Sequence, residues 1–170
     1  MFDNFFKHID IDPKNAHVLD GNAPNLVEEC KEYECKIEAA GGIELFVGGI
    51  GPDGHIAFNE PGSEVKGRTS VVDLTENTIA ANARFFDTID HVPRKAITMG
   101  IGTILEASKI VLMATGRNKA TAVARALSGG PGADSPASYL QSGEDVTFVL
   151  DADASSELPD ALIESAEFIF

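Results

Sequence analysis

Short apolar runs bounded by glycines or polar residues restrict the folds open to this chain. The clearest are IELFV, KIVLMA and VTFVL, at residues 43–47, 109–114 and 146–150. A short run that is largely apolar predicts a strand covered on both faces, as in a parallel sheet. Residues 69–74 and 96–99 predict two further strands, with helical stretches between. Because strands that alternate with helices form such sheets, the sequence predicts an α/β fold, a largely parallel sheet with helices on both faces.

Three helical segments are predicted, the first before the strand at 43–47 and the other two between later strands. The first follows Asn25, a favourable N-cap residue, and ends before the glycines at 41–42; its apolar positions are Leu26, Cys30, Tyr33 and Ile37. The second spans 75–86 with Thr75 as its cap, and the third runs from 116 to about 127. These helices are long enough to cover the strands.

The start of the chain predicts another helix. Phe2, Phe5, Phe6 and Ile9 have the spacing of an apolar helix face, and no strand precedes them. A complete doubly wound domain ordinarily begins with a strand and its phosphate-binding turn. Since no internal repeat or low-complexity linker divides the sequence, residues 1–170 are expected to form one partial domain.

The charge balance narrows the class of partner. Acidic residues number 27 against 13 basic ones, which gives a net charge of −14. This sign repels phosphate backbones and anionic lipid head groups, so neither nucleic acid nor a membrane is expected as a partner. With no membrane-length apolar run and no secretory pattern at the start, the expected compartment is the cytoplasm.

The cysteines and histidines do not predict a metal site. Cys30 and Cys35 are the only cysteines, and five positions along a helix turn two side chains about 140° apart. They are therefore expected to be reduced and structural. Neither a C-x-x-C nor an H-E-x-x-H spacing occurs in the sequence, so its four histidines do not indicate a metal site.

The densest group of chemically active residues directly follows the predicted strand at 43–47. Glycines open a backbone path closed to other residues, and Asp53, His55 and Glu60 lie within eight positions of one another. A histidine flanked by two carboxylates has its tautomer fixed and is suited to proton transfer. The same pattern also describes a loop histidine between two solvated acids. The residues alone leave both interpretations open.

The segment GGIGPDGHIAFNEPGS, at 48–63, resembles the signature of the glucosamine-6-phosphate deaminase (glucosamine-6-phosphate isomerase) family. Further matching segments are FFKHIDI (5–11), LDGNAP (19–24), RT (68–69), NARFFD (82–87), VPRKAITMGIGTIL (92–105), TGRNKA (115–120) and PASYLQ (136–141). The resemblance implies a Rossmann-like fold of the deaminase/isomerase type. It also implies a hydrolase of amino-sugar catabolism that converts glucosamine 6-phosphate to fructose 6-phosphate and ammonia, with no redox cofactor or metal, and a homo-oligomer.

The resemblance assigns roles to single residues as well. His55 would move the proton between O1 and the ring oxygen of the sugar, while Asp53 and Glu60 orient and charge-stabilise it. Arg84 and Lys119 would bind the phosphate of the substrate. The fork of an arginine and a lysine near a helix start both suit that anion.

Two elements of the family pattern have no counterpart in this sequence: a Gly-Leu-Pro-Thr-Gly phosphate loop and a Met-Asp-Glu-Tyr segment that supplies the base at C2. The chain is therefore expected to correspond to the C-terminal two-thirds of a deaminase. An alternative is a catalytically impaired fragment that binds a sugar phosphate or complements another chain. A third is a 6-phosphogluconolactonase, whose pattern lacks the HIAFNEP continuation. Ser70 and Val72 replace basic residues of allosterically activated members, which argues against activation by N-acetylglucosamine 6-phosphate.

Overall fold

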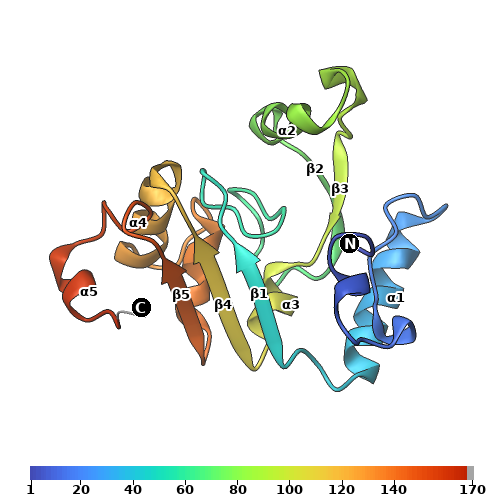
Figure 1. Cartoon of the computed structure of the whole chain (residues 1–170), viewed down its shortest axis with the longest axis horizontal. Coiled ribbons are helices and arrows are strands. Elements are labelled where there is room, and N and C mark those ends of the chain that lie inside the picture. Colours follow the sequence, from blue (N-terminus) through green and yellow to red (C-terminus); the bar gives the residue numbers. More distant parts are fainter. Residues whose placement is uncertain (168–170) are drawn as a thin grey trace.

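Three parallel strands form the centre of the chain in the computed structural model, which describes residues 1–167 (Figure 1). They are β1 (Leu45–Gly49), β4 (Lys109–Ala114) and β5 (Val146–Leu150), in the order β1–β4–β5. The prediction of an α/β fold with a parallel sheet is confirmed. Because the pairs are parallel, the three strands end at one edge of the sheet, where the loops that follow them meet.

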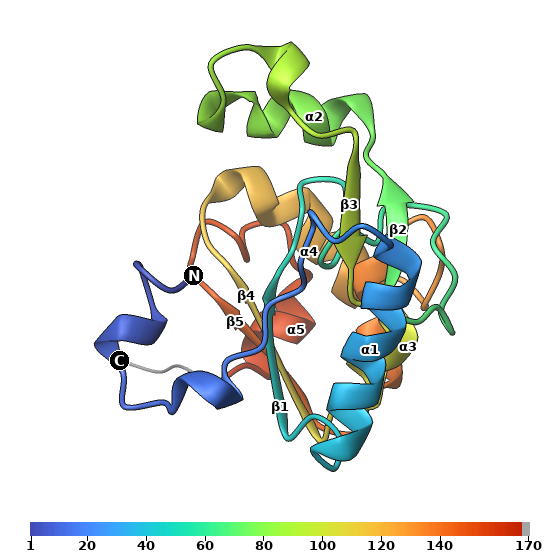
Figure 2. The same ribbon diagram turned by 90° about the vertical axis from the view of Figure 1, so that its right-hand side faces the viewer.

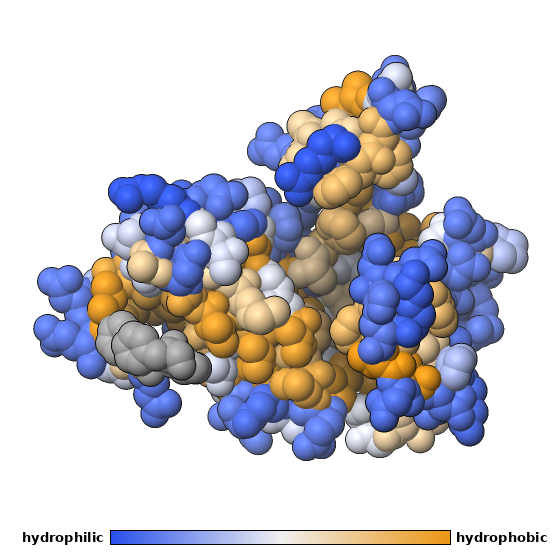
Figure 3. Space-filling model, in the orientation of Figure 1, coloured by the Kyte–Doolittle hydropathy of each residue, from blue (hydrophilic) through white to orange (hydrophobic). Residues whose placement is uncertain are grey.

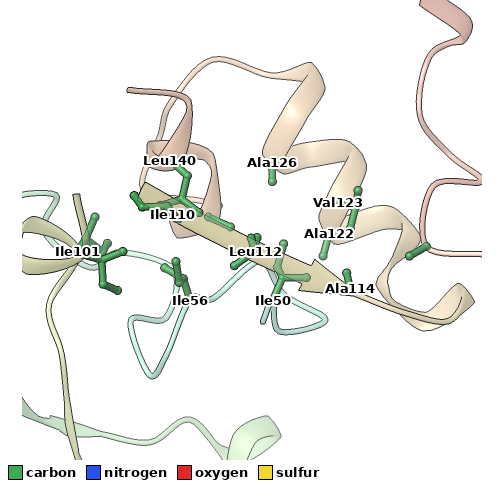
Figure 4. Close-up of a cluster of buried hydrophobic side chains, with 13 residues drawn as sticks. Ile50, Ile56, Ile101, Ile110, Leu112, Ala114, Ala122, Val123, Ala126 and Leu140 are labelled. Carbon is green, nitrogen blue, oxygen red and sulfur yellow. The ribbon is translucent and has the colours of Figure 1, made fainter. Parts of the chain in front are cut away.

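One face of this sheet carries the hydrophobic core. Contributing to it are α3 (Ile101–Leu105), α4 (Ala120–Ser128) and the 3-10 helix η6 (Pro136–Ser142). Figure 4 shows Ile110 and Leu112 of β4 among the side chains of these elements, and both are at most 1% exposed. The burial of such side chains is the main stabilising term for a domain of this size.

The opposite face of the sheet is apolar and exposed. Leu45, Val47, Met113 and Val149 are 40–52% exposed, and Figure 3 shows apolar residues gathered over the strands. The sequence predicted helices on both faces, but among the described residues the helices that contribute to the buried core lie on one. The apolar character of a strand indicates that both of its faces favour burial, but it does not show which element would pack on each face.

The strands predicted at 69–74 and 96–99 are present, but they lie outside the parallel sheet. β2 (Ser70–Asp73) and β3 (Lys95–Thr98) pair antiparallel with each other. They form an arm, shown in Figures 1 and 2, that holds three further helices away from the sheet. These are α2 (Glu76–Asn82), η3 (Ala83–Phe85) and η4 (Ile89–His91). An apolar pattern predicts a strand but not its partner, which explains the difference.

Close backbone contact fixes the base of the arm. The Gly102 N–H donates a hydrogen bond of 2.9 Å to the Gly67 carbonyl oxygen. A Cβ added to Gly100 would lie 2.1 Å from the same oxygen. Only glycine fits at position 100, and the chain that leaves β3 is thereby held against the chain that enters β2.

Helix α1 (Leu26–Ala39) begins as predicted, because the Asn25 side chain accepts a hydrogen bond from the Glu28 N–H at 3.2 Å. Both cysteines of this helix are free, as expected. Burial raises the pKa of the Cys30 thiol, which disfavours the reactive thiolate.

Glu34 connects α1 to the arm and to α3. Its carboxylate accepts hydrogen bonds from the Thr69 N–H at 2.9 Å, from Thr103 Oγ1 at 2.7 Å and from Arg68 Nη2 at 2.7 Å. Burial acts to raise the pKa of Glu34, but the hydrogen bonds from Thr69, Thr103 and Arg68 together outweigh it, so the pKa lies below its ordinary value. The ionised form is therefore the one that holds the three elements together.

The prediction of a helix with Phe2, Phe5, Phe6 and Ile9 on its apolar face is wrong. Residues 1–25 contain only the 3-10 helices η1 (Phe6–His8) and η2 (Pro13–Asn15). The Phe6 ring packs at a steep angle against two neighbouring rings, with its centroid 5.1 Å from that of Phe2 and 5.5 Å from that of Phe5. A short α-helix without a surface to pack on is marginal in water, and no α-helix forms in residues 1–25.

Two short elements complete the description: η5 (Arg117–Lys119), between β4 and α4, and α5 (Asp160–Glu164), near the end of the described residues. No helix within residues 1–167 has both the length and the apolar character that crossing a membrane requires.

Neighbouring residues of β4 provide a test of this architecture. Leu112 is fully buried whereas Met113 is 49% exposed on the other face. Leu112→Ala is expected to lower the free energy of unfolding by about 2–5 kcal/mol, since it leaves a cavity. Met113→Ala is expected to lower it by about 1 kcal/mol or less. Urea denaturation measures both, and equal losses would contradict the assignment of faces.

Candidate functional site

The loop that follows β1 folds back over its own start. The Gly51 N–H donates to the His55 carbonyl oxygen at 2.9 Å, and the Gly54 N–H donates to the Gly51 carbonyl oxygen at 3.0 Å. Gly54 has a φ of +91°, a conformation that other residues rarely adopt. Ile56, fully buried in the core, anchors the end of the turn. The glycine-rich sequence therefore builds a tight turn at the edge of the sheet.

The imidazole of His55 lies directly on Gly51. A Cβ added to Gly51 would lie 2.2–2.4 Å from three atoms of the His55 ring. No side chain fits at position 51 with the ring in this position. Glycine is thus required here by the approach of the histidine.

Asp53 is the charged partner of His55. Its Oδ1 lies 2.7 Å from Nδ1 of the ring and accepts a hydrogen bond of 3.2 Å from the His55 N–H. The Nδ1 contact is close but lacks the alignment of a linear hydrogen bond, and Nδ1 is buried without another partner. A carboxylate at Nδ1 orients the ring and leaves the other nitrogen for proton transfer. The structure thus pairs two of the three residues of the predicted cluster.

Glu60 is held elsewhere. Its carboxylate accepts hydrogen bonds from Thr75 Oγ1 at 3.1 Å, from the Thr75 N–H at 3.2 Å and from Thr78 Oγ1 at 2.5 Å. No hydrogen bond or ion pair joins Glu60 to His55 among the described contacts. The structure places this carboxylate, which is 8% exposed, against the first turn of α2.

Lys119 reaches the same loop from the turn after β4. Its Nζ donates a hydrogen bond of 2.7 Å to the Ile50 carbonyl oxygen. Burial lowers the pKa of Lys119, while the negative charge of Asp53 acts in the opposite direction. Because β1 and β4 are adjacent parallel strands, their following segments meet and bring this ammonium to the histidine loop.

A cleft of about 650 Å³ lies between this loop and the arm. Four of the residues predicted from the sequence line it: Asp53, His55, Arg84 and Lys119. Arg84 comes from η3, at the end of α2, and its guanidinium carbon lies 4.7 Å from the centre of the Phe85 ring. Glu60 does not line the cleft, although one of its hydrogen-bond partners, Thr78 of α2, does.

Five other residues that line the cleft were not singled out from the sequence: Phe58, Asn77, Thr78, Ala81 and Asn82. Four of them have helical spacing, because residues 77, 78, 81 and 82 lie on one side of the helix predicted over 75–86. The sequence did not show that this side faces the histidine loop. That placement depends on the direction of the arm.

A larger hollow, of about 1310 Å³, lies beside α1 and β2. The one arginine among its lining residues, Arg68, is already paired with Glu34 at 2.7 Å and with Glu106 at 2.6 Å. None of the residues of the histidine loop lines it. The smaller cleft, which combines the Asp53–His55 pair with two cations, is therefore the candidate site.

Known proteins match this chain over most of its length. Residues 1–149 match the family described as glucosamine-6-phosphate isomerases/6-phosphogluconolactonase. The chain is 52% identical over 159 residues to a glucosamine-6-phosphate deaminase from Aedes aegypti, which covers 93% of this chain and 57% of that relative. It is 50% identical over 169 residues to one from Thermoanaerobacter sp. (strain X514), covering 99% of this chain and 67% of the relative. The chain thus spans little more than half the length of the insect protein.

Solved structures share the fold. A structure described as a monomeric glucosamine-6-phosphate deaminase superposes with a TM-score of 0.88 at 47% identity, over 91% of this chain and 64% of that one. The 6-phosphogluconolactonase from Trypanosoma brucei superposes with a TM-score of 0.61 at 21% identity, over 88% of this chain and 58% of that one. At that identity, the second likeness shows the fold alone.

The electrostatic effect of Asp53 on Lys119 can be tested by titration. Asp53→Asn removes a negative charge that favours the ammonium form, so the pKa of Lys119 is expected to fall further below its ordinary value. NMR titration of the Lys119 side chain measures this shift. Asp145→Asn, which removes the partner of Lys109 instead, is the control and should leave Lys119 unchanged. An equal or higher pKa of Lys119 in Asp53→Asn would show that the charge of Asp53 does not act on Lys119.

Proposed function

Because the chain belongs to the family of glucosamine-6-phosphate isomerases and 6-phosphogluconolactonases, we propose that it acts as a glucosamine-6-phosphate deaminase. Its substrates are glucosamine 6-phosphate and water, and its products are fructose 6-phosphate and ammonia. The convergence of the Asp53–His55 pair with Arg84 and Lys119 on one cleft is the observation that carries this proposal. The domain that performs it is residues 1–170 taken as one unit.

The proposed chemistry begins with ring opening. His55, oriented by Asp53 at 2.7 Å, moves the proton between O1 and the ring oxygen of the sugar. The negative charge of Asp53 stabilises the imidazolium that forms during the transfer. In the overall reaction a hydrogen moves from C2 to C1, the amine leaves C2 as ammonia, and the oxygen of water takes its place as the C2 carbonyl. Atoms and electrons therefore balance without an external oxidant or cofactor.

Arg84 and Lys119 supply the attraction for the sugar phosphate. With a net charge of −14, the chain as a whole repels an anionic substrate, so cations inside the cleft must overcome that repulsion. The Lys119 ammonium already has the Ile50 carbonyl oxygen as one acceptor, which leaves two of its three donors for phosphate oxygens. Arg84 offers a bidentate fork from the other side of the cleft.

A second candidate function is the binding of a sugar phosphate without isomerisation. The observation that favours it is the composition of the cleft, where Asp53 is the only carboxylic acid among the described lining residues. Asp53 is already engaged with His55, so no second carboxylate is at hand to remove the C2 proton. A homo-oligomer, which the resemblance implies, stays a prediction, since the solved relative with a TM-score of 0.88 is described as monomeric.

Incubation with glucosamine 6-phosphate tests the first candidate. We expect release of ammonia and fructose 6-phosphate in equal amounts, and a loss of about 10²- to 10⁴-fold in His55→Ala, since a positioned proton-transfer group contributes that factor. Calorimetric binding without any product would support the second candidate instead. Hydrolysis of 6-phosphogluconolactone by the same sample, with no ammonia from the amino sugar, would overturn both.

Substitution of the cations tests phosphate binding separately from the chemistry. Arg84→Met and Lys119→Met are each expected to weaken the binding of glucosamine 6-phosphate by about 10- to 100-fold, the effect of losing hydrogen bonds to a charged group. Arg125→Met, which removes an equal charge from α4 outside this cleft, is the matched control. If all three variants lost affinity equally, the general charge of the chain rather than the cleft would account for binding.

A further inference from the structure

The most strongly held carboxylate near the cleft is that of Glu60, and α2 is what holds it. Three donors from the start of that helix reach the carboxylate: the Thr75 N–H, Thr75 Oγ1 and Thr78 Oγ1. Thr75 is also the N-cap, whose hydroxyl oxygen accepts a hydrogen bond of 3.3 Å from the Thr78 N–H. The start of α2 and the end of the histidine loop are thus joined through one buried acid.

Thr78 differs from Thr75 in where it lies. It lines the cleft, whereas neither Thr75 nor Glu60 does. Thr78 is 6% exposed, and its hydroxyl contact with Glu60, at 2.5 Å, is the shortest that this carboxylate makes. Among the described residues, Thr78 is therefore the side chain that both contacts Glu60 and faces the space that a ligand would fill.

We propose that Thr78 is a positioning residue for the reaction, because its hydroxyl fixes the Glu60 carboxylate beside the cleft. This inference rests on the proposed deaminase function. A threonine hydroxyl has a single hydrogen, and the short contact commits that hydrogen to Glu60. The fixed negative charge behind it favours the positive charge that develops on His55 and on the amine of the substrate.

The position of Glu60 then depends on α2, and so on the arm. The donor side chains are those of Thr75, the N-cap of α2, and of Thr78 within α2, while Glu60 belongs to the loop that begins at the sheet. A hydrogen bond to a charged group weakens steeply with small changes in distance and angle. The hydroxyl of Thr78 therefore sets where the carboxylate stands relative to the cleft.

A first experiment examines the free protein and needs no turnover. Thr78→Val keeps the shape of the side chain and removes the donor, while Thr78→Ser keeps the donor. We expect the ¹³C resonance of the Glu60 carboxyl carbon, at fixed pH, to move in Thr78→Val and to stay near its parent position in Thr78→Ser. Thr121→Val is the matched control, because it removes a threonine-to-glutamate hydrogen bond of 2.9 Å outside the cleft. Should Thr78→Val not fold, Thr78→Ala takes its place.

A second experiment is a double-mutant cycle on turnover of glucosamine 6-phosphate. Thr78→Val is expected to lower kcat by about 10-fold or more, as for a lost hydrogen bond to a charge, with KM changed by less than about 2-fold. In the Glu60→Gln background the same substitution should cause no further loss, since its effect acts through that carboxylate. Thr78→Ser should restore most of the rate.

The outcomes separate this inference from the proposed function. Losses that multiply in the double variant, or a Glu60 resonance that does not respond to Thr78→Val, overturn the positioning role. A parent chain that yields no product overturns the proposed function, and the NMR comparison of Thr78→Val with Thr121→Val still decides whether Thr78 fixes the carboxylate.

Discussion

The parallel pairing of β1 with β4 is the constraint on which the site depends. It sets Gly49 opposite Met113, so both strands end at the same edge, and the histidine loop and the turn that carries Lys119 begin side by side. The hydrogen bond from Lys119 to the Ile50 carbonyl oxygen then joins the two segments. A shift of the register would separate the ammonium from the loop and from the charge of Asp53, which acts on it. The buried face of the sheet stabilises this register through residues such as Leu112.

The cleft is assembled from two bodies that differ in how they are supported. The histidine loop rests on the parallel sheet and on the buried Ile56, whereas α2 and Arg84 belong to the antiparallel arm. The arm meets the rest of the chain at its base, through the Gly67 backbone and through Glu34 of α1. Near the cleft itself, Glu60 joins the loop to α2. A carboxylate therefore holds the arm at each place: the half-buried Glu34 at the base and the buried Glu60 near the cleft. Each is paired with hydroxyl donors that offset its loss of hydration.

The exposed face of the sheet is the largest departure from an ordinary α/β domain. Apolar side chains of β1, β4 and β5 lie on it with 40–52% of their surface accessible to solvent. Exposed apolar patches of this kind mark surfaces of interaction in folded proteins. The candidate site lies at the strand ends rather than on this face, so its geometry does not depend directly on what occupies the face.

The sequence by itself determined the local elements and most of the chemistry. The apolar runs predicted the strands, Asn25 and Thr75 marked helix starts, and the glycine-rich segment brought Asp53 and His55 together as the candidate pair, because these signals depend on a few neighbouring residues. Tertiary structure decided what pairs with what. It turned β2 and β3 into a separate arm, left one sheet face open and brought Arg84 and Lys119 to one cleft from segments far apart in the chain. It also placed Glu60 against Thr75 and Thr78 instead of His55. Contacts of this range are set by packing between elements, and no local pattern records them.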